Sequence, residues 1–159
     1  YPGDFVRNGG AKAGEVVAQC VETTAPDRFT RLGHNDLLFV DSGHTVRTGS
    51  DVNFLFLDVL PRLAPGVVVH IHDINLPYEY PRIYFTNPRF RVFWTEAYLL
   101  QAFLSLNREF EVLLGMCWIM RERMDVFRKA FPHYDPAQHK LTSGSFWIRR
   151  KPSGQTERP

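Results

Sequence analysis

Two short segments carry the side chains best suited to chemistry: Asp-Ser-Gly-His at residues 41–44 and His-Ile-His-Asp at residues 70–73. Carboxylates and imidazoles are ligands for divalent cations. A histidine whose pKa lies near neutrality also suits a general base. The candidate metal ligands are Asp41, His72 and Asp73, and the candidate catalytic base is His44.

Structural explanations compete with these roles. Asp and Ser residues just after strands are common in turns and caps. We expect His70 and His72 to point in opposite directions, with His72 in a crevice and His70 in the core beneath a helix. A metal-dependent hydrolase built on His70, His72 and Asp73 is a third interpretation. It lacks the further His and Asp ligands that such a centre needs at recognisable strand ends.

Hydrophobic patterning places both segments at the ends of strands. The apolar runs at residues 37–40 and 67–71 predict strands buried on both faces of a parallel sheet. Between them, Ser50 or Thr48 is expected to cap a helix that stops at Pro65. This is a right-handed crossover unit, and ligands of such sheets bind beyond the carboxyl ends of the strands. Asp41 and Asp73 are therefore expected to lie side by side.

The rest of the chain predicts a single domain at residues 15–151, between a loose lead-in at 1–14 and a disordered tail at 152–159. Aromatic residues in the irregular segment 74–90 either form a lid or pack back on the domain; they are Tyr78, Tyr80, Tyr84 and Phe85. The other expected elements are a short strand at 16–21, a helical turn near Phe29, a helix at 96–106, and strands at 110–114 and 145–150 that pair antiparallel at one sheet edge.

Composition excludes several classes of protein. The net charge of +2 and the scattered basic residues argue against nucleic-acid binding. No apolar run reaches the length of a membrane span, and no signal pattern opens the sequence. The two cysteines have neither the spacing of a zinc site nor the density of a disulfide scaffold. We therefore expect a soluble cytoplasmic protein.

Four longer segments resemble a known family. LLFVDSGHTVRTGSDV, LPRLAPGVVVHIHDI, WTEAYLLQAFLSLN and SFWIRR are similar to the C-terminal half of class I S-adenosylmethionine-dependent methyltransferases, in the methyltransferase 24 or macrocin O-methyltransferase-like group. The resemblance covers about residues 15–150. It implies an α/β fold with a Rossmann-like, mostly parallel sheet and a C-terminal antiparallel hairpin, in which the N-terminal strands are missing.

The resemblance also implies an activity for a full-length parent protein of which this chain is a truncated part. That activity is methyl transfer from S-adenosylmethionine to a small-molecule acceptor, at a hydroxyl rather than an amine. Similar metal-dependent enzymes hold Mg²⁺ at the positions of Asp41 and Asp73 and use a base at the position of His44. His72 stands where those enzymes have a further acidic residue. We expect Asp41 and Ser42 to contact the cofactor.

The chain departs from the family at its N-terminal end. The first strand, its glycine-rich turn and the acidic residue that holds the ribose are absent, and no apolar strand precedes Gly9 and Gly10. These parts supply most of the cofactor site. The departure leaves a non-catalytic fragment or binding module as the alternative function. The unpaired hydrophobic sheet edge that it implies favours pairing with another chain, such as a homodimer.

Overall fold

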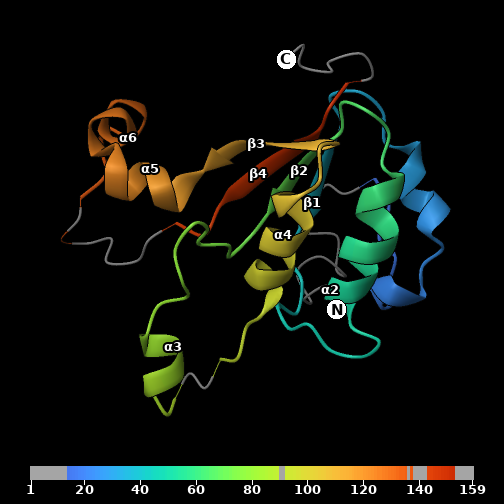
Figure 1. The fold of residues 1–159 in the computed structure, drawn as a ribbon, viewed down its shortest axis with the longest axis horizontal. Coiled ribbons are helices and arrows are strands. Elements are labelled where there is room, and N and C mark those ends of the chain that lie inside the picture. The colour runs from blue at the N-terminus through green and yellow to red at the C-terminus, as the bar shows by residue number, and fades with distance from the viewer. Residues whose placement is uncertain (1–13, 90–91, 136, 138–142, 153–159) are drawn as a thin grey trace.

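A computed structural model describes residues 14–89, 92–135, 137 and 143–152 (Figure 1). Its centre is a four-stranded sheet with the order β1-β2-β4-β3. β1 and β2 are parallel, and β4 is antiparallel to both of its neighbours. The strands are β1 (Leu37–Val40), β2 (Val68–Ile71), β3 (Phe110–Gly115) and β4 (Phe146–Arg150). The lead-in and the tail predicted from the sequence lie almost wholly outside the described residues.

The predicted crossover between the parallel strands is confirmed, but its helix is irregular. It consists of α2 (Asp51–Asn53), the π-helical segment η3 (Phe54–Val59) and the 3₁₀ turn η4 (Leu60–Arg62). Ser50 caps it, because its Oγ accepts a hydrogen bond of 3.2 Å from the backbone N of Asn53. Gly66 then turns the chain into β2 with a φ of +89°, where a side chain would meet His34.

The predicted strand at residues 16–21 is wrong. Residues 16–20 form no regular element, and the 3₁₀ turn η1 (Val21–Thr23) follows them. Val16 and Val17 are exposed and pair with no strand. Valine-rich sequence favours a strand only where a sheet edge accepts it. The helical turn predicted near Phe29 is confirmed as η2 (Pro26–Arg31).

The C-terminal region contains the expected antiparallel pair of β3 and β4, with two additions. β4 lies between β2 and β3, so the last strand is internal to the sheet. Two helices missed from the sequence, α5 (Met116–Glu122) and α6 (Met124–Ala130), follow β3 and lie beyond its end (Figure 1). Each has seven residues, and they break at Arg123, so neither gives a long periodic pattern. A short α3 (Ile83–Thr86) interrupts the aromatic segment.

The core lies on one face of the sheet. Val40, Ile71 and Ile148 pack there in one cluster with η3 and with α4 (Glu96–Ser105), which confirms the helix predicted at 96–106. The opposite face is open: Phe39 of β1 is 54% exposed. Its ring contacts His70 of β2, which stacks on Trp147 of β4 with ring centroids 4.3 Å apart. One face is therefore covered by helices, while the other carries a partly exposed row of rings. The prediction that β1 and β2 are buried on both faces is wrong, since Leu37 and Phe39 of β1 are 50% and 54% exposed.

The architecture is mixed α/β and consistent with the methyltransferase-like fold expected from the sequence. The described sheet has one parallel and two antiparallel strand pairs, and no strand precedes β1 among the described residues. No helix in this part of the chain is long and apolar enough to span a membrane.

Candidate active site

The site is built around His44, in the loop that leaves the carboxyl end of β1. His44 has a φ of +55°, in the left-handed region that non-glycine residues rarely occupy. Its carbonyl oxygen accepts hydrogen bonds from the backbone N of Thr95 (2.8 Å) and of Glu96 (3.1 Å), at the start of α4. Its own backbone N donates to Ser42 Oγ at 3.0 Å. These bonds hold the loop against the N-terminus of α4.

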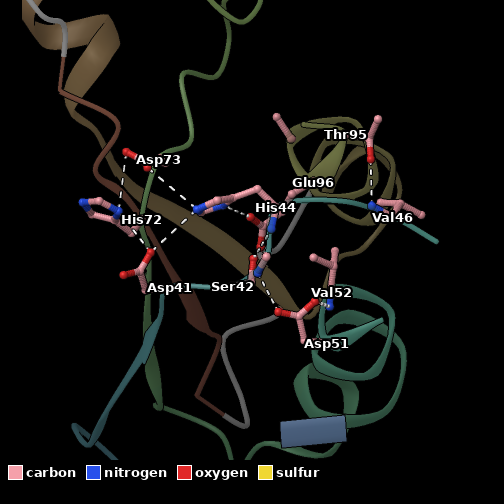
Figure 2. A network of polar contacts seen from close by, with 12 residues as sticks. Asp41, Ser42, His44, Val46, Asp51, Val52, His72, Asp73, Thr95 and Glu96 are labelled. Atoms are coloured by element: carbon pink, nitrogen blue, oxygen red, sulfur yellow. Dashed lines mark hydrogen bonds and ion pairs between the residues drawn. The ribbon is translucent and has the colours of Figure 1, made fainter. Parts of the chain in front are cut away.

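The two ring nitrogens of His44 have different surroundings (Figure 2). Nδ1 lies 2.7 Å from Oε2 of Glu96, whose side chain is fully buried. Nε2 faces the other way and lies 3.7 Å from Asp41 Oδ1 and 3.8 Å from Asp73 Oδ2. The Trp94 ring lies beside the imidazole, with centroids 4.4 Å apart. Nδ1 is therefore hydrogen-bonded to a buried carboxylate, whereas Nε2 faces two carboxylates that are more accessible to solvent.

The structure brings Asp41 and Asp73 together, as the parallel pairing of β1 and β2 predicts. Asp73 follows β2 with a φ of +59°. The neighbouring Ile74 donates a backbone hydrogen bond to Gly144 O at 2.8 Å. Gly144 packs so closely that a Cβ there would lie 2.6 Å from the Cα of Asp73. The position of this carboxylate therefore depends on the chain segment that enters β4.

The expectation that His70 and His72 point in opposite directions is wrong. Both rings contact Phe39, on the open face of the sheet. The reason is the two-residue period of a strand, which puts residues i and i+2 on the same side. His72 is half-exposed, with Nδ1 3.3 Å from Asp41 Oδ1 and 3.5 Å from Asp73 Oδ1, but makes no hydrogen bond through this nitrogen. His70 Nε2 instead lies 2.9 Å from Ser145 Oγ.

Charge and burial act in opposite directions on His44. Burial lowers the pKa of its imidazole, but the hydrogen bond to Glu96 and the negative charges of Glu96, Asp73 and Asp41 outweigh burial, so the pKa is raised above 6.5. Burial, followed by the nearby His72, lowers the pKa of His70. The pKa values of His44, in the loop after β1, and of His70, in β2, are thus shifted in opposite directions.

The predicted metal ligands do not form a coordination site in this arrangement. Within the described ranges, no group of three or more His, Cys, Asp or Glu side chains is placed to hold a metal ion. The prediction of Mg²⁺ therefore gains no support. The hydrolase interpretation loses one of its ligands as well, because the Nε2 atom of His70 is directed at Ser145.

Ser42 and the aromatic segment have structural roles. Ser42 Oγ accepts the hydrogen bond from the His44 backbone, so the hydroxyl shapes the loop. Of the two expectations for the aromatic residues, packing back on the domain describes Tyr80, which is buried and accepts a hydrogen bond of 2.9 Å from Ala97 N. Tyr78 likewise donates to Glu122 of α5 at 2.6 Å. Phe85 is exposed.

Sequence reasoning missed Glu96 and Trp94. Glu96 is the first residue of α4, where an acidic side chain is ordinarily explained by the helix dipole. It lies 52 positions from His44, so no local spacing connects the two. The only available signal was an acidic residue next to a tryptophan and a threonine at a predicted helix start. That signal does not specify a partner.

Comparison with known proteins gives one match. Residues 3–74 match a family model described as a methyltransferase domain. No curated protein and no solved structure matches the chain. The matched range ends just after β2, so it contains Asp41, His44 and Asp73 but not Glu96. The match supports a methyltransferase domain in this chain, and the matched range contains the histidine and both accessible carboxylates of the site.

Proposed function

We propose that this protein transfers the methyl group of S-adenosylmethionine to a hydroxyl of a small-molecule acceptor, with His44 as the general base. The observation that carries the proposal is the placement of His44 within the range that matches a methyltransferase domain. The side chain of His44 is 9% exposed and its ring is hydrogen-bonded at Nδ1, while Nε2 faces the carboxyl ends of two parallel strands. Ligands of open sheets bind at this location.

The residues present fit the cofactor's charge. In the described part of the chain, neither Asp41 nor Asp73 forms an ion pair with a lysine or arginine, and their charged contacts are with His44 and His72. Two such carboxylates suit a positively charged group. When bound, S-adenosylmethionine supplies an electrophilic methyl group on a sulfonium. Asp41, half-exposed at the end of β1, is the residue that we expect to face it.

The proton balance defines the role of His44. In such a transfer the acceptor oxygen would bond to the methyl carbon, and the electron pair of the carbon–sulfur bond would stay on the sulfur of the cofactor. The hydroxyl proton moves to His44 Nε2, which makes the ring an imidazolium between Glu96, Asp41 and Asp73. These carboxylates stabilise the positive ring, which is also the reason that its pKa is raised.

The surroundings of the base suit an organic acceptor. The ring of Trp94 contacts His44, and Tyr84 packs edge-on against Trp94 with centroids 5.0 Å apart. Aromatic side chains next to a few polar groups are typical of small-molecule sites. The family match gives no support to a non-catalytic binding module. We further propose that β1, the crossover helix and β2 belong to a Rossmann-like, mostly parallel sheet of the macrocin O-methyltransferase-like kind.

Two measurements test the function. Isothermal titration of S-adenosylmethionine into the 159-residue protein, with and without Mg²⁺, tests cofactor binding. Transfer of a labelled methyl group to a panel of hydroxyl and amine acceptors tests the reaction. We expect His44→Gln to lower kcat by about 10²–10⁴-fold with little change in KM, because the base acts in the transition state.

The matched control is His133→Gln, an exposed histidine outside the site, which we expect to leave the rate unchanged. A His44→Gln protein with the wild-type rate would rule out the base. Failure of the wild-type protein to bind S-adenosylmethionine would overturn the proposed reaction for this chain.

A further inference from the structure

His44 is attached to the start of α4 through both its backbone and its side chain. Its carbonyl oxygen accepts the N–H groups of Thr95 and Glu96, and its Nδ1 lies against the Glu96 carboxylate. Two residues further on, Val46 N donates to Thr95 Oγ1 at 2.7 Å. The left-handed φ of His44, which non-glycine residues rarely adopt, accompanies these contacts. Such a conformation persists only where its surroundings stabilise it.

Glu96 differs from an ordinary acidic residue at a helix start. Its side chain is fully buried, whereas a carboxylate that only complements a helix dipole is normally in contact with solvent. Burying a carboxylate is costly unless it is paired. In the described part of the chain, the side-chain partner of its Oε2 is His44, and its Oε1 has no hydrogen-bond partner. Its burial is therefore compensated chiefly by the imidazole.

We infer that Glu96 is a positioning residue that keeps the proton of neutral His44 on Nδ1 and leaves the Nε2 lone pair directed at the acceptor. The physical reason is that an ionised carboxylate can only accept a hydrogen bond, so the nitrogen against it must carry the proton. The same carboxylate fixes the ring orientation, and it stabilises the imidazolium once Nε2 takes a proton. The catalytic meaning of this inference rests on the proposed function of His44.

His72 provides an internal comparison. Its Nδ1 approaches the same two carboxylates, Asp41 and Asp73, without forming a hydrogen bond, and its side chain is 45% exposed. No buried carboxylate orients its ring among the described contacts. Of the two histidines next to these carboxylates, His44 is the one whose ring orientation is held by a hydrogen bond to a buried carboxylate in the described structure.

The tautomer of His44 can be measured without any catalysis. We would record long-range proton–nitrogen correlation spectra of the nitrogen-15-labelled 159-residue protein, above the pH at which its histidines are protonated. His44→Gln assigns the signals by their loss. We expect the Nδ1–H tautomer at His44 in the wild-type protein. A wild-type His44 in the Nε2–H form would overturn the inference, and this measurement needs no variant at Glu96 to fold.

Glu96→Leu tests the cause, because it keeps the buried position filled while removing the acceptor. We expect His44 to lose its preference for Nδ1–H. Where the protein turns over substrate, kcat is expected to fall by about 10²–10⁴-fold with little change in KM. The matched control is Glu79→Leu, which removes a carboxylate that accepts a hydrogen bond from Tyr98 of α4 but lies against no histidine. We expect it to leave the His44 tautomer unchanged, and circular dichroism checks the fold of both variants.

The outcomes separate the two proposals. An unchanged tautomer in folded Glu96→Leu overturns the positioning role, whether or not methyl transfer occurs. An absence of methyl transfer in the wild-type protein overturns the proposed reaction, while the tautomer measurement still decides what Glu96 does to His44.

Discussion

The raised pKa of His44 has consequences for stability as well as for chemistry. Three carboxylates, on Asp41, Asp73 and Glu96, favour the charged ring more strongly than burial disfavours it. The folded protein therefore binds the His44 proton more tightly than the unfolded chain, whose histidines titrate near 6.5. The stabilisation is fully present below about pH 6.5 and is lost as the pH rises through the higher, folded-state pKa.

We accordingly predict that the difference in unfolding free energy between wild-type protein and His44→Gln is larger at about pH 6 than at about pH 9. Urea denaturation of both proteins at the two pH values measures it. The test compares wild-type protein with His44→Gln at each pH, because both contain His70. The lowered pKa of His70 adds a contribution of opposite sign to the pH dependence of stability in each protein. A difference that does not change with pH would mean that His44 has no raised pKa.

At the scale of elements, the site depends on a close contact between the segment entering β4 and the end of β2. Gly144 lies so near the backbone of Asp73 that a Cβ would approach its Cα, C and N atoms to 2.6, 3.0 and 3.1 Å. Backbone atoms cannot move aside as a flexible side chain can. The absence of a side chain at residue 144 is therefore a condition for the present position of Asp73.

Gly144→Ala is expected to destabilise the protein by about 1–3 kcal/mol, the usual cost of overpacking, and to displace Asp73 from His44. Urea denaturation and the change in the His44 nitrogen shifts report the two effects. Gly14→Ala is the control, since nothing lies within 4 Å of a Cβ at that glycine. We expect it to change stability by less than about 0.5 kcal/mol. Equal effects of the two substitutions would contradict the close approach.

In the molecule as a whole, β4 joins the two parts of the sheet, because it pairs with β2 on one side and with β3 on the other. Ile148 lies in register between Val69 of β2 and Val112 of β3 and is fully buried against the core. Val112, its direct partner on the edge strand, is 54% exposed. The last strand of the chain therefore contributes more to the core than the strand before it, although both have similar sequence patterns.

Ile148→Ala is predicted to cost about 2–5 kcal/mol of unfolding free energy, through lost burial and the cavity left behind. Val112→Ala, in the partner position, is predicted to cost less than about 1 kcal/mol. Denaturant titration of both variants measures this contrast. Similar losses at the two positions would show that β3, and not only β4, is covered by the core.

Local sequence patterns were enough to predict the crossover unit and the two places where polar residues follow strands. Continuous apolar runs at residues 37–40 and 67–71, with a helical pattern between them, predicted parallel neighbours joined by a crossover, and the strands pair in this way. The burial of both faces that such runs suggest does not occur, since Phe39 lies on an open face. The parallel pairing brings Asp41, His44 and Asp73 to one edge of the sheet. The helix at residues 96–106 was predictable from apolar residues on one helical side, and the antiparallel pair of β3 and β4 from two strand patterns with no clear long helix between them.

The contacts that complete the site depend on how the elements pack together, which local patterns do not specify. The valines near residue 16 have a strand-forming sequence but pair with neither edge strand of the described sheet, and two seven-residue helices are too short for their periodicity to stand out. The partner of His44 is Glu96, on an element that no local pattern connects to it. Local spacing specifies which side chains leave the same end of a sheet, whereas a pairing across 52 residues depends on how a helix packs onto that sheet.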